Sequence, residues 1–332
     1  MENIEMKNIL LSIKNLDVEY TSEKRIIHAV NGVSLDVLQG ETLGLVGETG
    51  AGKTTIAKSI LRILPDRAAT IKDGEVIFDS RDLLKLKTED MQRIRGVRIS
   101  MVFQDPMTSL NPIKTIGSQV SSVIALHKKV KKEAAWRLAT ELLAMVGITE
   151  DRMFEYPHQF SGGMKQRVII AMALACDPDL LIADEPTTAL DVTIQAQVLD
   201  MVRALKKEKN TSMILITHDL GIVAENCDTV AIIYAGEIVE YGSKEDIFDR
   251  PSHPYTIGLF GAIPDLEIDT EWLEPIVGLP PDPSNLPSGC AFHPRCPYVS
   301  DDCVKDRIDM ISIEGLHMCS CLNIDSVAAR RK

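Results

Sequence analysis

An eight-residue segment near the N-terminus, Gly47-Glu-Thr-Gly-Ala-Gly-Lys-Thr54, constrains the fold of this chain more than any other feature. It has the spacing G-x-x-x-x-G-K-[ST], and it lies between the apolar run Leu43–Val46 and a helix-favouring stretch from Lys53 to about Leu64. In such a unit the glycines let backbone N–H groups turn toward a phosphate, and the helix adds the positive end of its dipole. A chance glycine-rich turn would not need the flanking strand and helix, so we predict a phosphate-binding loop (P-loop).

The side chains at the end of this loop predict bound ATP and Mg²⁺. Lys53 is expected to reach the β- and γ-phosphates, and the Thr54 hydroxyl is expected to bind Mg²⁺. The residues predicted to surround the phosphates are Gly47, Glu48, Thr49, Gly50, Ala51, Gly52, Lys53, Thr54 and Thr55.

Two carboxylates, Asp184 and Glu185, directly follow the apolar run Leu180–Ala183. If this run is a buried strand, Asp184 lies at its carboxyl end and can hold Mg²⁺ beside the P-loop. Phosphoryl transfer to water needs a polarised, in-line water, which a carboxylate next to the metal ligand can orient, so Glu185 is the candidate catalytic base. Considered without its neighbours, Glu185 is better explained as a strand-end acid that faces solvent.

The rest of the chain alternates between strand and helix patterns. The β-favouring runs Leu11–Tyr20 and Val33–Val37 predict an antiparallel layer, and the region of about residues 110–175 predicts an inserted helical subdomain. Beyond the first helices of that subdomain, alternation of helices and strands predicts a parallel sheet with helices on its faces. These segments are the helix Met164–Cys176, the strand Leu180–Ala183, the helix Thr193–Lys207 and the strand Met213–Thr217. The predicted fold class is α/β, with a mixed sheet.

A change in composition predicts a second, smaller domain. After Pro251 proline and glycine become frequent, and Pro275–Pro287 is typical of a linker or loop. The length of 332 residues is enough for one large core plus a smaller unit. We place the boundary near Pro264, which gives a nucleotide-binding domain over residues 1–263 and a Pro/Cys-rich domain over residues 264–332.

The charge balance argues against nucleic acid as a partner. The formal net charge is −12, whereas binding to phosphate backbones needs a clustered basic surface. The longest apolar runs are far shorter than the ~20 residues that cross a bilayer, so we expect a cytosolic chain. Thiols stay reduced in that compartment, so the seven cysteines are not expected to form structural disulfides.

The segment Phe160-Ser-Gly-Gly-Met-Lys-Gln-Arg167 resembles the signature sequence of ABC ATPases, which distinguishes them from other P-loop proteins. Ser161 and the N–H groups of Gly162 and Gly163 open a predicted helix, which makes another anion site. The resemblance implies that Ser161, Gly162, Gly163 and Met164 face the γ-phosphate of ATP held by a partner subunit.

Further positions match this resemblance in the expected order. Gln104 matches the Q-loop glutamine, a catalytic residue and Mg²⁺ ligand, and Asp191 in Ala189-Leu-Asp191 matches the D-loop. His218 matches the switch histidine that would contact the γ-phosphate. The same resemblance assigns Tyr20 to stack on adenine, although a packed or half-exposed strand tyrosine is equally consistent with composition.

Longer segments narrow the resemblance to the ATPase subunits of oligopeptide, dipeptide and nickel importers. Met164, where most ABC signatures have Gln, resembles the first of the two ATPases in such systems, which implies a heterodimer with a second ATPase. The resemblance also implies two membrane permease subunits, an extracytoplasmic solute-binding protein, and a peripheral location on the cytoplasmic face of the membrane. A permease segment is expected to dock around Gln104 and the helical subdomain. The matching segments are Gln104–Pro112, Tyr156–Met164, Ser252–Thr256 and Ser288–Pro297.

The function that this resemblance implies is ATP hydrolysis that energises import of dipeptides or oligopeptides, through ATP-driven closure and opening of an ATPase dimer. Import of nickel or another solute is the alternative within the family. A soluble ABC protein that acts on nucleic acid or ribosomes is a rival, but the acidic charge and the single ATP cassette argue against it. A binding module without turnover is the third alternative, which substitution of Glu185 would test.

Four cysteines near the C-terminus predict a metal site. Their spacing, Cys290-x5-Cys296-x6-Cys303-x17-Cys321, provides thiolates for zinc or an iron–sulfur cluster, but it lacks the paired C-x2-C motifs of common zinc modules. The family resemblance implies a [4Fe–4S] cluster, and its pattern of His, three residues and Cys matches His317 and Cys321. Cys319 is then an extra thiol. Reduced, buried cysteines without metal are the alternative.

Overall fold

The computed structural model describes residues 8–22, 25–105, 109–187, 191–262 and 275–324. The chain folds into two compact units, and each unit gathers segments that are far apart in the sequence. The ranges of unit 1 are Met1–Ile9, Val37–Thr42 and Lys85–Ile216. The ranges of unit 2 are Leu10–Asp36, Leu43–Leu84 and Thr217–Lys332.

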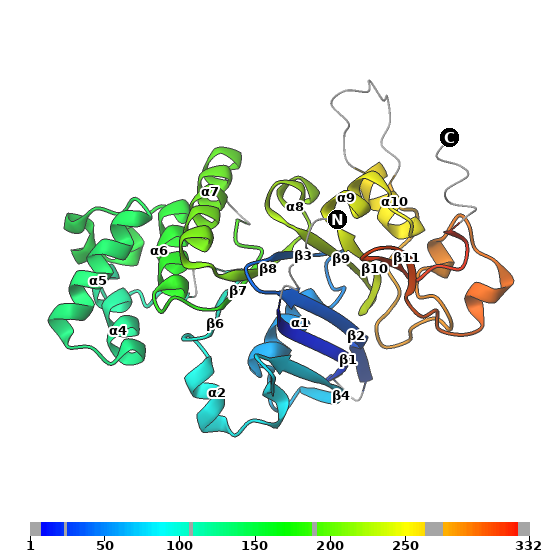
Figure 1. The fold of residues 1–332 in the computed structure, drawn as a ribbon, viewed down its shortest axis with the longest axis horizontal. Coiled ribbons are helices and arrows are strands. Elements are labelled where there is room, and N and C mark those ends of the chain that lie inside the picture. The colour runs from blue at the N-terminus through cyan, green and yellow to red at the C-terminus, as the bar shows by residue number, and fades with distance from the viewer. Residues whose placement is uncertain (1–7, 23–24, 106–108, 188–190, 263–274, 325–332) are drawn as a thin grey trace. The chain divides into compact units, whose positions relative to one another are not determined.

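Unit 2 contains a four-stranded sheet with the order β2-β1-β4-β5 (Figure 1). β1 pairs antiparallel with β4, from Leu11 opposite Phe78 to Tyr20 opposite Ala69. Leu11, Ile13 and Val18 on β1 are buried, as expected of strands with one face on the core. The antiparallel layer predicted from the sequence is therefore confirmed. The strands are β1 (Ile9–Ser22), β2 (Arg25–Leu38), β4 (Ala69–Phe78) and β5 (Arg81–Asp82).

A second set of strands in unit 2 combines the strand before the P-loop with strands from the C-terminal part of the chain. β3 pairs parallel with β9, β9 pairs antiparallel with β10, and β12 pairs antiparallel with both β10 and β11. The sheet is therefore mixed, as predicted, but its last two strands were not predicted from the sequence. The strands are β3 (Thr42–Val46), β9 (Thr229–Tyr234), β10 (Glu237–Ser243), β11 (Ile311–Glu314) and β12 (His317–Cys319).

The helices of unit 2 are short, and α8, α9 and α10 begin with side-chain caps. Ser243 and Asp246 form a reciprocal capping box at the start of α9, and the His253 side chain accepts a hydrogen bond from the Tyr255 N–H at the start of α10. The helices are α1 (Lys53–Leu61), α8 (Leu220–Asn226), α9 (Lys244–Asp249) and α10 (Pro254–Gly261), with 3₁₀ turns at Leu83–Lys85, His293–Arg295 and Asp301–Val304.

Unit 1 contains three parallel strands, β6 (Ile99–Val102), β7 (Leu180–Asp184) and β8 (Ser212–Thr217). β7 lies between the other two, with Leu180 opposite both Ile99 and Ser212. All residues of β7 and β8 are buried, which is typical of parallel strands that are covered on both faces. The predicted parallel strands are therefore confirmed.

The remaining part of unit 1 is helical, as predicted. α4 contacts α5 and α6, and α6 contacts α7 (Figure 1). The approach of α4 to its neighbours is close, because a Cβ atom at Gly117 would lie 2.8 Å from the Trp136 ring. The helices are α2 (Thr88–Ile94), α4 (Ile116–Lys128), α5 (Lys132–Met145), α6 (Gly162–Leu174) and α7 (Val192–Lys209), with 3₁₀ turns at Glu150–Phe154 and Pro157–Gln159.

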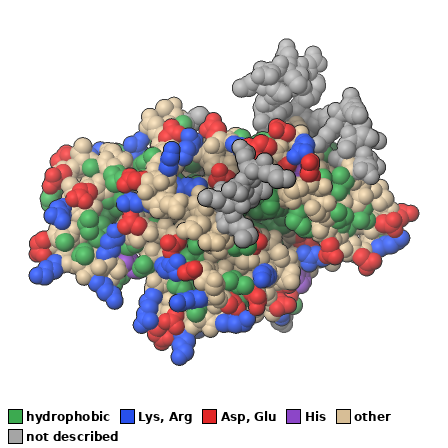
Figure 2. Space-filling model, in the orientation of Figure 1, with side chains coloured by type: hydrophobic (Ala, Val, Ile, Leu, Met, Phe, Trp, Pro, Cys, Tyr) green, Lys and Arg blue, Asp and Glu red, His purple; other side chains and the backbone are tan. Residues whose placement is uncertain are grey.

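The predicted boundary between residues 263 and 264 lies at the edge of the described residues, so the division into domains 1–263 and 264–332 stays a prediction. Described residues on both sides of it belong to unit 2. Within the described residues, no helix combines the length and apolar character needed to cross a membrane. On the face shown in Figure 2, basic side chains are interspersed with acidic ones.

Candidate nucleotide site

The P-loop of unit 2 needs glycine at its first and sixth positions. A Cβ atom at Gly47 would lie 2.1 Å from the Ile233 carbonyl oxygen, far inside van der Waals contact. Gly52 has a φ of +104°, and a Cβ atom there would lie 2.4 Å from the Ala29 carbonyl oxygen. Backbone from β9 and β2 therefore presses against the loop and fixes its path.

Lys53, the first residue of α1, lies inside the loop with only 6% of its surface exposed. Its Nζ donates hydrogen bonds to the carbonyl oxygens of Gly47 at 2.6 Å and Glu48 at 2.9 Å. These bonds use two of the three ammonium protons. The loop thus holds a buried cation at the amino end of a helix, which is the arrangement that a polyphosphate requires.

Tyr20 lies at the carboxyl end of β1, close to the start of α1. Its hydroxyl oxygen is 3.4 Å from Oγ1 of Thr55, and either oxygen can be the donor. The structure therefore brings Tyr20 to the P-loop, as the family resemblance implies, and its stacking on adenine stays a prediction.

The carboxyl end of β7, in unit 1, carries the two predicted carboxylates. Asp184 is 2% exposed, and the Glu185 N–H donates to the Ile216 carbonyl oxygen at 2.8 Å. Glu185 has a φ of +47°, a left-handed conformation that costs of order 1 kcal/mol or more in a residue other than glycine. The Gln104 side-chain amide donates to a Glu185 carboxylate oxygen at 2.8 Å, so the structure brings these two predicted residues together.

The signature segment begins α6, as predicted. Ser161 is the N-cap, and its hydroxyl accepts a hydrogen bond from the Met164 N–H at 3.4 Å. Gly162 and Gly163 form the first turn. Because Ser161 and Gly162 are exposed, the amino end of this 13-residue helix is accessible to an anion.

The other two predicted residues also lie at helix starts. Asp191 is the N-cap of α7 and accepts a hydrogen bond from the Ile194 N–H at 3.0 Å. Ala189 and Leu190 of the predicted D-loop lie outside the described residues. His218 follows β8 and is exposed, directly before Asp219, which caps α8. Their contacts with nucleotide stay predictions.

The predicted nucleotide residues divide between the two units. Unit 2 carries the P-loop, Tyr20 and His218, whereas unit 1 carries Gln104, Asp184, Glu185 and Asp191. The signature segment Ser161–Met164 is also part of unit 1.

Two residues that support the P-loop were not predicted from the sequence. The Tyr255 hydroxyl accepts a hydrogen bond from the Glu48 N–H at 3.0 Å. Arg295 forms an ion pair with the Glu48 carboxylate at 3.0 Å, and the Arg295 side chain is only 6% exposed. Both residues belong to the segments Ser252–Thr256 and Ser288–Pro297, which carried the family resemblance. That resemblance was the only signal for them in the sequence.

The four cysteines predicted as a set, Cys290, Cys296, Cys303 and Cys321, line one cavity of unit 2. Its volume is about 10 Å³, room for about one water molecule. Burial raises the pKa of both Cys290 and Cys296 to about 11 and also raises the pKa of Cys321. These thiols are therefore protonated at neutral pH unless a cation replaces the protons.

Three of these sulfurs share one hydrogen-bond pattern. The Tyr298 N–H donates to Cys296 Sγ and the Asn323 N–H donates to Cys321 Sγ, each at 3.4 Å. The Phe292 N–H bonds to Cys290 in the same way and lowers the thiol pKa against the effect of burial. In each case the donor lies two residues after the cysteine.

Among the described residues, no three His, Cys, Asp or Glu side chains are arranged to hold a metal ion.

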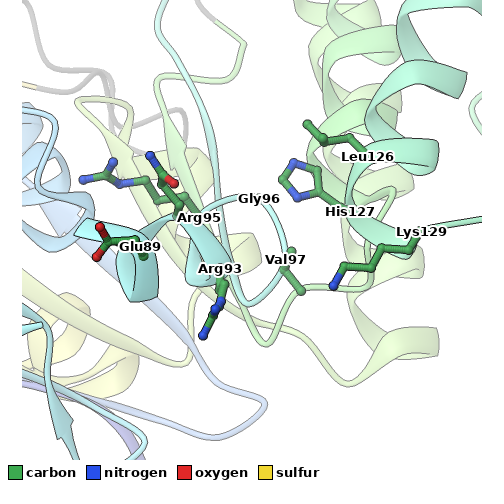
Figure 3. A pocket seen from close by; sticks show the side chains of 9 residues that line it. Glu89, Arg93, Arg95, Gly96, Val97, Leu126, His127 and Lys129 are labelled. Carbon is green, nitrogen blue, oxygen red and sulfur yellow. The ribbon is translucent and has the colours of Figure 1, made fainter. Parts of the chain in front are cut away.

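A larger hollow, of about 880 Å³, lies in unit 1 between α2 and the carboxyl end of α4 (Figure 3). Its rim carries more basic than acidic groups, and the Leu126 side chain beside it is 72% exposed. The residues that form it and that Figure 3 labels are Glu89, Arg93, Arg95, Gly96, Val97, Leu126, His127 and Lys129.

Two family models match this chain. Residues 30–188 match the ABC transporter family, and residues 239–303 match the C-terminal region of oligopeptide/dipeptide transporters. The second match contains Tyr255 and Arg295.

Curated proteins match over most of their length. A dipeptide transport ATP-binding protein of Bacillus subtilis is 50% identical over 87% of this chain and 87% of that protein. An oligopeptide transport ATP-binding protein of the same species is 45% identical over 97% of this chain and 99% of that protein. An oligopeptide transport ATP-binding protein of Escherichia coli is 46% identical over 89% of this chain and 87% of that protein.

Solved structures of ABC proteins are also similar to this chain. A dimeric ATP-binding cassette in a post-hydrolysis state, bound to ADP and phosphate, has a TM-score of 0.64 and 28% identity and covers 70% of this chain and 98% of its own. A protein from Clostridium perfringens, part of the ABC transporter complex cbiONQ, has a TM-score of 0.64 and 26% identity and covers 76% of this chain and 96% of its own. The chain is therefore an ATPase of the ABC transporter family, in the group of ATP-binding proteins that includes these dipeptide and oligopeptide transport proteins.

Proposed function

We propose that this chain hydrolyses ATP to energise import of dipeptides or oligopeptides. The observation that carries the proposal is the match of residues 239–303 to the C-terminal region of oligopeptide/dipeptide transporters, because this region lies outside the part shared with ABC ATPases in general. The same region contributes Tyr255 and Arg295 to the support of the P-loop.

The proposed chemistry assigns one task to each residue. Lys53 binds the β- and γ-phosphates, and the buried Asp184 carboxylate and the Thr54 hydroxyl are oxygen donors of the kind that Mg²⁺ prefers. Bound Mg²⁺ would neutralise phosphate charge. Glu185 accepts the proton of the attacking water, and the hydrogen bond from Gln104 keeps its carboxylate in one orientation. His218 would contact the γ-phosphate.

We propose a second ATPase as the partner in a heterodimer. The exposed amino end of α6, with Ser161 and Gly162 at its start, is suited to a γ-phosphate held by that partner. ATP then joins two subunits and its hydrolysis releases them, so nucleotide biases an open–closed equilibrium.

Two membrane permease subunits, with an extracytoplasmic solute-binding protein, are the further proposed partners, and they would place the chain on the cytoplasmic face of the membrane. The hollow between α2 and α4 supports a docking surface on unit 1, since it joins a basic rim to an exposed apolar side chain. A Leu126→Asp variant should lose stimulation of ATP hydrolysis by the permeases and keep its basal rate. Unchanged stimulation would place the permease contact elsewhere.

We also propose that the Cys-rich tail is a distinct functional element that holds a [4Fe–4S] cluster through Cys290, Cys296, Cys303 and Cys321. The shared cavity supports this set, and Cys319 is not among the residues that line it. Backbone N–H groups aimed at three of the sulfurs would stabilise thiolates. A cluster holds its cysteine sulfurs farther apart than a single zinc ion does, so the thiol-bearing loops must separate to admit it.

The cluster proposal is tested on anaerobically purified protein. Iron and sulfide in equal amounts, with broad visible absorption that Cys296→Ser removes, would support it. A colourless protein that contains zinc alone would contradict it.

The transport proposal is tested by reconstitution with the two permeases, the second ATPase and the solute-binding protein in vesicles. Labelled dipeptide or oligopeptide should accumulate with ATP and fail to accumulate with Glu185→Gln. Accumulation of nickel instead of peptides would identify the alternative solute. Capture of ribosomes or DNA by the purified chain, with no transport, would overturn the proposal.

A further inference from the structure

Arg295 lies between the four cysteines that share a cavity and the P-loop, both in unit 2. It ends the 3₁₀ turn His293–Arg295 and directly precedes Cys296, which is one of the four cysteines that line a common cavity. Its guanidinium points to the P-loop, where it donates to both carboxylate oxygens of Glu48, at 3.0 and 3.2 Å. This two-pronged geometry suits the planar fork of arginine and cannot be reproduced by lysine.

The guanidinium is enclosed by partners from the C-terminal half of unit 2. It donates to the Tyr234 hydroxyl at 3.3 Å and to the carbonyl oxygens of Val277 at 3.2 Å and Ile276 at 3.4 Å. Its Cζ lies 5.8 Å from the ring centroid of Tyr234, within the range of cation–π attraction. The position of this cation is therefore strongly determined before ATP binds.

Glu48 is held at three points. Tyr255 binds its N–H at 3.0 Å, the Lys53 ammonium binds its carbonyl oxygen at 2.9 Å, and Arg295 binds its carboxylate. The Glu48 carbonyl is one of the two that position Lys53. Displacement of the Glu48 side chain would therefore be transmitted to the group that binds the β- and γ-phosphates.

A purely structural ion pair is the alternative explanation. Such a pair would stabilise unit 2 without changing how the folded P-loop binds ATP. The contacts favour a role in binding, because the partner of Arg295 is a P-loop residue rather than a residue of a neighbouring strand. Arg307 provides the comparison: it pairs with Glu237 on β10 at 3.2 Å and donates to the Asn31 carbonyl oxygen at 2.8 Å.

We propose that Arg295 is a positioning residue for the P-loop, and that through Glu48 it couples the conformation of the cysteine-bearing segment 290–296 to ATP affinity. The proposal rests on ATP binding at the P-loop and is independent of which solute is transported. Coupling of this kind is reciprocal: if an ordered segment 290–296 favours ATP binding, ATP binding must order that segment to the same extent.

The first experiment measures the equilibrium affinity of a non-hydrolysed ATP analogue for the full chain. Arg295→Met should weaken binding about tenfold or more, and Arg295→Lys should weaken it less because it keeps the charge and loses the fork. The matched control, Arg307→Met, should stay within about twofold. Parental affinity in folded Arg295→Met protein would overturn the proposal. If that variant does not fold, Arg295→Lys decides it in the same way.

A double-substitution cycle identifies the route. If Arg295 acts through Glu48, then Arg295→Met should have little further effect on affinity in a Glu48→Gln background. Independent, additive losses would show that Arg295 does not act through Glu48 and would contradict the proposal.

Hydrogen–deuterium exchange of residues 288–304 tests the reciprocal effect without reference to activity. Addition of the ATP analogue should slow exchange in the parental protein and in Arg307→Met, and it should leave exchange unchanged in Arg295→Met under conditions that saturate the nucleotide site. Equal slowing in Arg295→Met, or no slowing in the parental protein, would refute the coupling.

Discussion

The P-loop and the carboxyl end of β7 carry the main predicted nucleotide residues, and the structure holds them in different ways. The P-loop is fixed by contacts from distant parts of unit 2: backbone carbonyls press on Gly47 and Gly52, and side chains bind Glu48. Glu185 in unit 1 has a left-handed backbone conformation and a hydrogen bond from an exposed Gln104. The difference indicates that contacts from distant segments fix the P-loop, whereas the hydrogen bond from Gln104 orients the proposed catalytic carboxylate of Glu185.

The largest effect is expected at Glu185. Replacement of Glu185 by Gln removes the base and keeps the size of the side chain, so kcat should fall by about 10²- to 10⁴-fold. ATP binding should persist, and an ATP-bound dimer with the partner ATPase should accumulate. Steady-state ATPase assays and size-exclusion chromatography measure these two effects. Hydrolysis at the parental rate would mean that Glu185 is not the base.

The P-loop is tested by two glycines that differ in their surroundings. Gly47→Ala forces a Cβ atom against the Ile233 carbonyl, so it should cost about 3 kcal/mol of unfolding free energy or abolish ATP binding. A Cβ atom at Gly50 would meet no atom within 4 Å. The cost of Gly50→Ala in unfolding free energy is therefore limited to the backbone strain of its φ of +85°, about 1 kcal/mol. Chemical denaturation compares them. Equal losses would show that close contact does not fix the loop.

Acid should weaken the support of the P-loop. Burial lowers the pKa of His253 to about 4 in the folded protein, against 6.5 for an ordinary histidine. Between these values the unfolded chain takes up a proton that the folded chain does not. Stability therefore falls as pH decreases from 6.5 to 4, by about 2 kcal/mol at pH 5.

Denaturation curves at pH 7 and pH 5 measure this loss, and His253→Gln should reduce the difference between them. Protonation of His253 at Nδ1 also removes the acceptor of the Tyr255 N–H. Because the Tyr255 hydroxyl binds the N–H of Glu48, acid is expected to weaken a contact that supports the P-loop. An unchanged pH dependence in His253→Gln would assign the acid sensitivity to other groups.

The smallest effect is expected at Gln104. Gln104→Ala removes the hydrogen bond to Glu185 and should lower kcat about tenfold with little change in affinity for ATP. Gln104→Glu places a like charge beside Glu185 and should lower kcat further. If both variants keep the parental kcat, the hydrogen bond does not orient the base.

Much of the regular secondary structure could be predicted from the sequence because the patterns that indicate strands and helices are local. The apolar run before the P-loop, the run before Asp184 and the helical region of about residues 110–175 correspond to β3, β7 and the helices α4, α5 and α6. The ion pair between Glu48 and Arg295 joins residues 247 positions apart, and no local pattern indicates it. β11, Ile311–Glu314, alternates apolar and polar residues, but a run of four residues is too short for this pattern to predict a strand by itself.

The site was predictable in its residue types and less so in its conformation. Glycine at positions 47 and 52 follows from the motif, and the structure supplies the reason, which is contact with backbone from other strands. The left-handed conformation of Glu185 depends on its bond to Ile216 and on the contacts around it, which the sequence does not encode locally.

The pairing of β12 with β10 has a consequence for solubility. Without β11 and β12, β10 would expose unpaired N–H and C=O groups along one side. Such an edge can pair with a strand of another chain. The fully buried Glu240 would also lose His317, which binds its carboxylate at 2.8 Å. A chain shortened before Ile311 is therefore expected to aggregate through the unpaired edge of β10. The C-terminal strands thus protect the protein from self-association.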